Sequence, residues 1–155
     1  MAENGQTPAI GINVQYVKDL SFENPRAPHS FREMDPPPAI NVDVNISVDA
    51  LQPPEVFEVT LNLNARATRD DLVFFVVELA YGCVCTVSGV PPEHLRPVLT
   101  IEIPRLLFPF ARQVLADATR DGGFPPLMIN PIDFAALYQQ RMAEEMQQQG
   151  EGAQA

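Results

Sequence analysis

The sequence has no tryptophan, and only one of its ten basic residues is a lysine, Lys18. Acidic residues outnumber basic ones 20 to 10, which gives a net charge of −10. A charge of this sign repels phosphate groups and anionic lipids, so nucleic-acid binding and attachment to an acidic membrane surface are disfavoured. The sequence also lacks an apolar run of membrane-spanning length, and its first residues lack the basic and apolar regions of a signal peptide. We therefore expect a soluble, cytoplasmic protein that attracts basic partners.

Cysteine is also scarce, since only Cys83 and Cys85 are present. One residue separates them on a predicted strand, so both side chains point to the same face, which is poor geometry for a disulfide. Two ligands are too few for a metal site. We expect the pair to pack in a core or an interface, and a metal or redox role is the weaker alternative.

Motifs that carry catalysis are missing as well. The sequence has no phosphate-binding glycine loop, no GxSxG nucleophile elbow and no HExxH helix. The two histidines, His29 and His94, have no nucleophile or carboxylate pattern beside them, which favours solvated or capping roles. These absences predict a protein that is not an enzyme and that needs no cofactor or metal.

Alternation of apolar and polar residues is the strongest pattern that is present. It predicts strands with one buried face at residues 10–23, 40–48 and 57–65. On the first strand we expect the buried face to carry Ile10, Ile12, Val14, Tyr16, Leu20 and Phe22. Residues 72–88 are apolar on both faces, so this fourth strand must be covered on both. A second subunit is the favoured cover, because a chain of 155 residues has few elements left; cover within one chain is the alternative.

Helical spacing follows the four predicted strands. We expect a weak helix over 93–102, a second from Pro104 to the glycines at 122–123, and a third that begins at an Asn130 N-cap. Residues 1–9 form a polar, flexible arm, and residues 147–155 lack apolar anchors and form a flexible tail. The predicted fold of residues 10–146 is therefore an α+β domain, a four-stranded antiparallel sheet packed on C-terminal helices.

Two stretches offer binding surfaces. Acidic side chains at Asp19 and Glu23 line the polar face of the first strand, and Glu78 interrupts the outer face of the fourth. They form an acidic patch if the two strands are neighbours, and an ordinary solvated face is the alternative. Phe31 and Met34 lie in a proline-rich connection over residues 24–38, where they either flank a groove for apolar ligands or pin the loop onto its own core.

Several local strings together resemble the SecB family of protein-export chaperones. They are YVKDLSFENP at residues 16–25, APH at 27–29, LLFPFAR at 106–112, GFPPL at 123–127 and NPIDF at 130–134. The resemblance covers about residues 10–142 and implies an ATP-independent chaperone. Such a chaperone binds unfolded precursor proteins, keeps them translocation-competent and delivers them to the SecA motor. An oligomeric adaptor without client-holding activity is the alternative.

The resemblance also implies an assembly and a set of contact residues. The family assembles as a homotetramer, a dimer of dimers with helices between the dimers and the sheets outside. By match to the family's positions, contacts with SecA are expected at Asp19, Glu23, Val76 and Glu78. Positions linked to tetramer assembly are matched by Val77, Leu79 and Tyr81.

Overall fold

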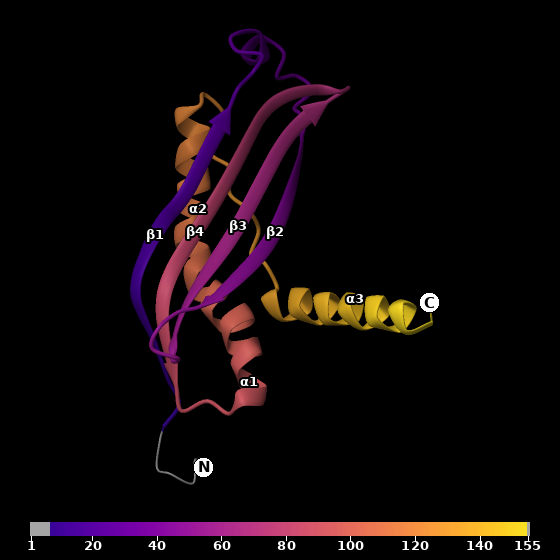
Figure 1. Ribbon diagram of the computed structural model, residues 1–155. Coiled ribbons are helices and arrows are strands. Elements are labelled where there is room, and N and C mark those ends of the chain that lie inside the picture. The colour runs from indigo at the N-terminus through magenta and orange to yellow at the C-terminus, as the bar shows by residue number, and fades with distance from the viewer. Residues whose placement is uncertain (1–6, 155) are drawn as a thin grey trace.

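Four antiparallel strands form one sheet, and helices cover one of its faces, in the computed structural model of the chain (Figure 1). The structure describes residues 7–154, and the side chains of residues 7–150. The strands are β1 (Ala9–Glu23), β2 (Ala39–Ala50), β3 (Val56–Arg69) and β4 (Leu72–Ser88). Their order across the sheet is β1-β4-β3-β2, so β1 and β2 are the edge strands. The predicted α+β fold is confirmed.

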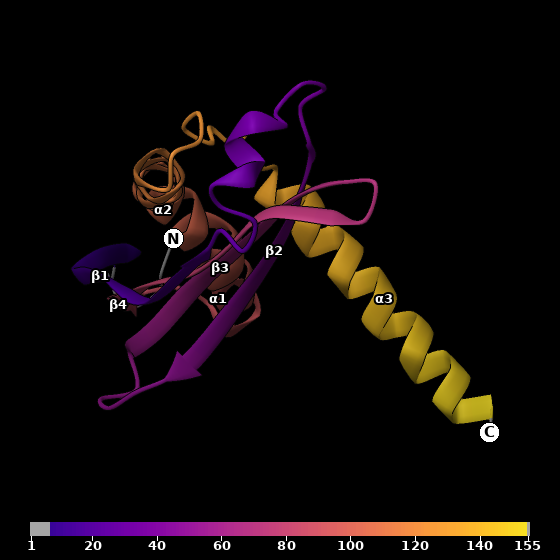
Figure 2. The same cartoon turned by 90° about the horizontal axis from the view of Figure 1, so that it is seen from above.

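The helices follow the last strand. They are α1 (Pro92–Pro97), the π-helical turn η2 (Val98–Glu102), α2 (Ile103–Asp121) and α3 (Phe134–Gln154), and a short helix η1 (His29–Arg32) lies in the proline-rich connection. The two helices expected between residues 93 and 121 are thus joined by η2. Seen from above, α2 lies along one face of the sheet and α3 projects away beyond β2 (Figure 2). No helix in the described part of the chain has the length and apolar composition to cross a bilayer.

The start and the end of α3 differ from the expectation. The N-cap is Asp133, whose carboxylate accepts the Ala136 N–H at 3.0 Å, so the predicted start at Asn130 is wrong. At its other end α3 continues through residues 147–154, where the sequence predicted a tail; Gln, Glu and Ala favour helix, whereas Gly150 and Gly152 do not. The flexibility of this segment stays a prediction. Of the predicted N-terminal arm, residues 1–6 lie outside the described residues.

The core lies between the sheet and α2, on what we call the inner face. Its fully buried side chains include Val59, Leu61, Leu63, Val77, Leu79, Leu107 and Leu115. Each such side chain stabilises the fold by about 1.5–3 kcal/mol relative to an exposed one. Both cysteines are free and fully buried in this core, which confirms the packing role. The neighbouring thiol of Cys85 and burial both raise the pKa of the Cys83 thiol, so it stays protonated.

Two β-bulges in β1 correct the predicted alternation of that strand. The register with β4 shifts after Ile12 and again after Val17, and each extra residue reverses the face of the side chains that follow. As a result Val14 and Tyr16 lie on the outer face, not on the buried one. Tyr16 lies opposite Gly82, and a Cβ at that glycine would stand 2.9 Å from the tyrosine ring. The second bulge returns the end of β1 to the predicted alternation.

The outer face of β4 is partly covered by side chains of its own sheet. Tyr16 crosses over Gly82 and donates a hydrogen bond to Glu58 on β3, and Lys18 Nζ lies 2.8 Å from Glu58 Oε1. Burial and Glu58 raise the pKa of Tyr16 to about 12. Hydrogen bonds from Lys18 and Tyr16 hold the pKa of Glu58 below its usual range. These contacts cover part of the outer face within one chain, and cover of the rest by a second subunit stays a prediction.

Apolar side chains are also left exposed on the helical side of the protein. They lie on β1 and α2 and are Ile10, Val17, Leu20, Leu106 and Phe110, each 42–53% exposed. These positions continue the apolar surface of the core to the outside of the chain. Apolar side chains are therefore exposed on the helical side as well as on the outer face, where Val14 is 50% exposed.

Candidate functional site

Register between β1 and β4 brings the predicted acidic residues together. Ser21 lies directly opposite Glu78, and Glu23 lies opposite Val76, all on the outer face. Asp19 is one pair further along, diagonal to Glu78. The condition for an acidic patch, that these two strands are neighbours, is therefore confirmed. We call the outer-face surface formed by these five residues the acidic patch.

The carboxylates of the acidic patch have no ion-pair partner in the part of the chain whose side chains are described. Asp19, Glu23 and Glu78 are all exposed. The one lysine, Lys18, is engaged by Glu58 instead. Three free carboxylates on a flat surface attract a basic partner.

A shallow hollow beside the acidic patch was not predicted. It is lined on β2 and β3 by Asn41, Asp43, Asn64 and Arg66, and on β4 by Val76 and Glu78. The alternation of apolar and polar residues in the sequence predicted that the polar residues of β2 and of β3 share one face of each strand. The order of the strands, which the sequence did not reveal, was needed to place them beside Glu78.

An apolar groove lies on the inner-face side of the sheet, away from the acidic patch. We call it the aromatic groove, and its volume is about 180 Å³. Every residue that lines it is apolar: Met34, Pro37, Pro38, Ile40, Phe75, Phe124, Pro125, Pro126, Leu127 and Met128. These residues come from the proline-rich connection, from β2, from β4 and from the segment after α2. Such a surface suits varied apolar side chains, to which Met and aromatic residues adapt.

Polar contacts hold the proline-rich connection in place around the groove. The Arg69 guanidinium, at the end of β3, donates to the backbone carbonyls of Glu33, at 2.6 Å, and Pro36. The Asn24 side-chain amide donates to the Gly122 carbonyl at the end of α2, at 3.2 Å. Met34 lies between these two attachments and is thereby fixed in the groove wall.

Aromatic rings form the floor of the groove around Phe124. Its ring centroid lies 4.9 Å from that of Phe75 and 5.2 Å from that of Phe31. Phe31 packs where Gly123 has no side chain, since a Cβ there would stand 2.7 Å from the Phe31 ring. Of the two residues proposed for the groove from the sequence, Met34 lines it, and Phe31 does not line it but packs against Phe124, which does.

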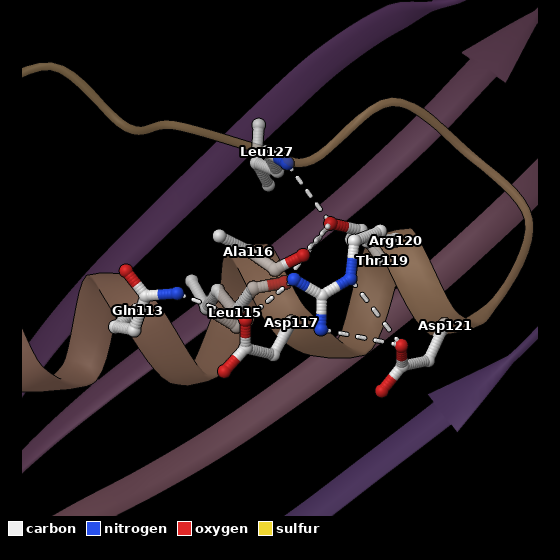
Figure 3. A network of polar contacts seen from close by, with 8 residues as sticks. All are labelled: Gln113, Leu115, Ala116, Asp117, Thr119, Arg120, Asp121 and Leu127. Carbon is white, nitrogen blue, oxygen red and sulfur yellow. Dashed lines mark hydrogen bonds and ion pairs between the residues drawn. The ribbon is translucent and has the colours of Figure 1, made fainter.

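A buried hydroxyl connects the floor of the groove to α2 (Figure 3). Thr119 is fully buried, and its Oγ1 lies 2.9 Å from the carbonyl of Leu115 on the preceding turn. The same oxygen accepts the backbone N–H of Leu127 at 2.9 Å. Thr119 therefore fixes the segment that carries Phe124 and Met128 against the end of α2.

The three residues matched to tetramer assembly lie inside the protomer. Val77, Leu79 and Tyr81 are only 0%, 1% and 8% exposed, on the inner face of β4. Tyr81 donates to the side chain of Gln15 on β1 at 3.1 Å. The three side chains thus support β1 and the helices rather than a free surface.

An exposed apolar groove beside the open edge of a sheet is typical of proteins that bind extended polypeptides. Comparison with known proteins agrees with this class. The family model described as "Preprotein translocase subunit SecB" matches residues 3–145. Curated relatives include the protein-export protein SecB of Sinorhizobium fredii, 60% identical over 93% of this chain and 89% of the relative. That of Mesorhizobium japonicum is 55% identical over 91% and 84%. The chain belongs to the SecB family of protein-export chaperones.

A solved structure supports the fold independently of sequence. The SecB-like chaperone of Mycobacterium tuberculosis, in complex with a ChAD peptide from an antitoxin, has a TM-score of 0.66 to this chain. The two share 16% identity, and the similarity covers 79% of this chain and 90% of the other. At this level of identity the comparison shows a shared fold.

Thr119→Val tests the link between the groove and α2. The valine keeps the shape of threonine but leaves the Leu127 N–H without its acceptor. We expect the free energy of unfolding to fall by about 1–2 kcal/mol in chemical denaturation. Thr119→Ser, which keeps the hydroxyl, should protect the Leu127 amide from hydrogen exchange as the unchanged protein does. Equal loss of that protection in both variants would contradict the role assigned to the hydroxyl.

Proposed function

We propose that the protein is an ATP-independent, cytoplasmic holdase that binds unfolded precursor proteins, keeps them translocation-competent and delivers them to the SecA motor. The observation that carries the proposal is the separation of two exposed surfaces. The aromatic groove opens on the inner-face side of the sheet at its β2 edge, and the acidic patch lies on the outer face along β1 and β4. Binding alone performs this function, so no catalytic residue, cofactor or metal takes part.

Clients bind in the aromatic groove as extended chains. Its lining offers apolar contact without a fixed polar pattern, so it recognises exposed apolar side chains and not one sequence. Ile40 places the groove beside the free edge of β2, where client backbone can hydrogen-bond. A folded protein hides its apolar side chains and its backbone hydrogen-bonding groups. Proteins that fold slowly expose both for longer and are therefore the clients that bind. The mycobacterial SecB-like chaperone, which has the same fold, is solved with a bound peptide, and this supports peptide binding by the fold.

SecA binds at the acidic patch. Its free carboxylates Asp19, Glu23 and Glu78 pair with basic groups of the motor, and Val76 supplies an apolar contact between them. Because this surface lies on the other face of the sheet, the motor can engage while a client remains in the groove.

Four copies assemble as a dimer of dimers. The exposed apolar side chains of β1 and α2, which include Val17 and Phe110, supply the surface that the neighbouring copies cover. Val77, Leu79 and Tyr81 act on this assembly from beneath, by supporting β1 and α2. Several grooves on one assembly raise the avidity for a long client.

Met128→Glu tests the groove. Met128 is 56% exposed, so the substitution is tolerated by the fold, but it places a charge where apolar client side chains bind. We expect about tenfold weaker binding of an unfolded test protein and a matching loss of aggregation suppression, both without nucleotide. Met146→Glu, at a residue 70% exposed on α3, is the matched control and should change neither. If the unsubstituted protein binds no unfolded test protein, the holdase proposal is wrong and the alternative, an adaptor without client-holding activity, is favoured.

Asp19→Lys tests the acidic patch. The reversal removes a carboxylate diagonal to Glu78 and adds a repulsive charge, so affinity for SecA should fall about tenfold at low salt. Client affinity should stay unchanged, because Asp19 lies on the other face of the sheet from the groove. Asp49→Lys, an exposed outer-face residue of β2, makes the same change of charge and should leave SecA binding near normal. Parallel loss of SecA and client binding would refute the separation of the two sites.

A further inference from the structure

The free edge of β2 is occupied by an arginine from α3. Arg141 Nη2 donates to the backbone carbonyl of Val44 at 2.8 Å, and Nη1 donates to the side-chain oxygen of Asn45 at 2.6 Å. The Val44 carbonyl therefore points away from β3, toward the open edge. Alternate residues of an edge strand point the same way, so Val42 and Ile46 direct their backbone groups to this edge too.

Arg141 lies between two apolar regions of the same strand edge. On one side, Ile40 lines the aromatic groove. On the other, Ile46 and Val48 line a second groove of about 380 Å³ against α1 and η2. From Ile40 to Val48 the strand spans about 26 Å, the length of an extended segment of about eight residues. The guanidinium occupies the middle of that path, where it takes the acceptor that a client backbone N–H would use.

Within residues 134–150, the apolar attachment of α3 to the rest of the protein is confined to its first two turns, where Leu137 also packs, half-buried, against the core. Phe134 at its start is buried against Phe108, with ring centroids 6.2 Å apart, whereas residues 143–150 are exposed. Up to residue 150, the polar side-chain contacts that join α3 to other elements beyond its first turn are those of Arg141 and an exposed ion pair between Arg96 and Glu145, at 2.8 Å. The part of α3 from Arg141 to residue 150 has no buried side chain, so it can separate from β2 at low cost while the first two turns stay packed.

We propose that Arg141 is a latch: it holds α3 across the free edge of β2 and divides the client site into two short grooves. When a long extended client displaces Arg141 from Val44 and Asn45, the two grooves join into one continuous site. The latch thus makes affinity depend on client length, since a short peptide fills the aromatic groove without opening it. This inference rests on the proposed holdase function and adds a residue that selects among clients.

Binding of labelled peptides to the full-length protein tests the latch. Two apolar, basic peptides of about 6 and about 18 residues distinguish a client that fills one groove from one that spans both. In Arg141→Ala we expect the long peptide to bind about tenfold more tightly in fluorescence anisotropy, because no contact must first be broken. The short peptide should bind as it does to the unchanged protein. Asn45→Ala removes one of the two contacts without altering charge and should strengthen long-peptide binding about threefold.

Arg105→Ala is the control for net charge, since Arg105 is exposed on α2 and pairs with Glu102 at 3.1 Å, away from both grooves. It should leave the affinities for both peptides unchanged. Equal tightening of long and short peptides by Arg141→Ala would overturn the latch in favour of a charge effect. Weaker binding of the long peptide would also overturn it, because Arg141 would then be a client contact. If the unchanged protein binds neither peptide, the holdase function itself fails.

Discussion

Pairing between β1 and β4 is the interaction on which the rest of the structure depends. It inserts β4 between the first strand and β3, and so leaves β2 as the second edge of the sheet. On the outer face the pairing sets Ser21 opposite Glu78 and creates the acidic patch. On the inner face it makes β4 the centre of the core under α2. One pattern of hydrogen bonds therefore separates a charged surface from an apolar one.

The aromatic groove depends on two irregular segments that pack beside the sheet, the one after α2 and the proline-rich connection. The segment after α2 has no regular structure until α3, and its place is set by the buried hydroxyl of Thr119 and by the ring of Phe124 on Phe75. Arg69 draws the proline-rich connection toward the same point. A rigid sheet thus carries a groove made from two irregular segments, and irregular segments suit a surface that accepts many apolar sequences.

Features that follow from a repeating pattern of residues could be predicted from the sequence, whereas features that depend on contacts between distant residues could not. Period-two alternation was enough to find the strands and to bring Asp19, Glu23 and Glu78 to one face once the strand order was known. It failed at Val14 and Tyr16, because a β-bulge leaves no mark in composition but reverses every side chain after it. The groove was foreseen only through Met34 and Phe31, since the approach of the connection to residues 124–128 has no local pattern. The Asp133 cap was missed because Asn130-Pro131 also resembles a helix start.

Opposite faces for client and motor are the central claim, and simultaneous binding tests it most directly. The affinity of SecA for the protein should be measured without nucleotide, first with the client site empty and then saturated with an unfolded polypeptide. The account predicts two affinities that agree within about twofold, with the client still bound in the complex, because independent sites have no coupling free energy. A loss of about tenfold or more on client loading, or release of the client when SecA binds, would contradict it.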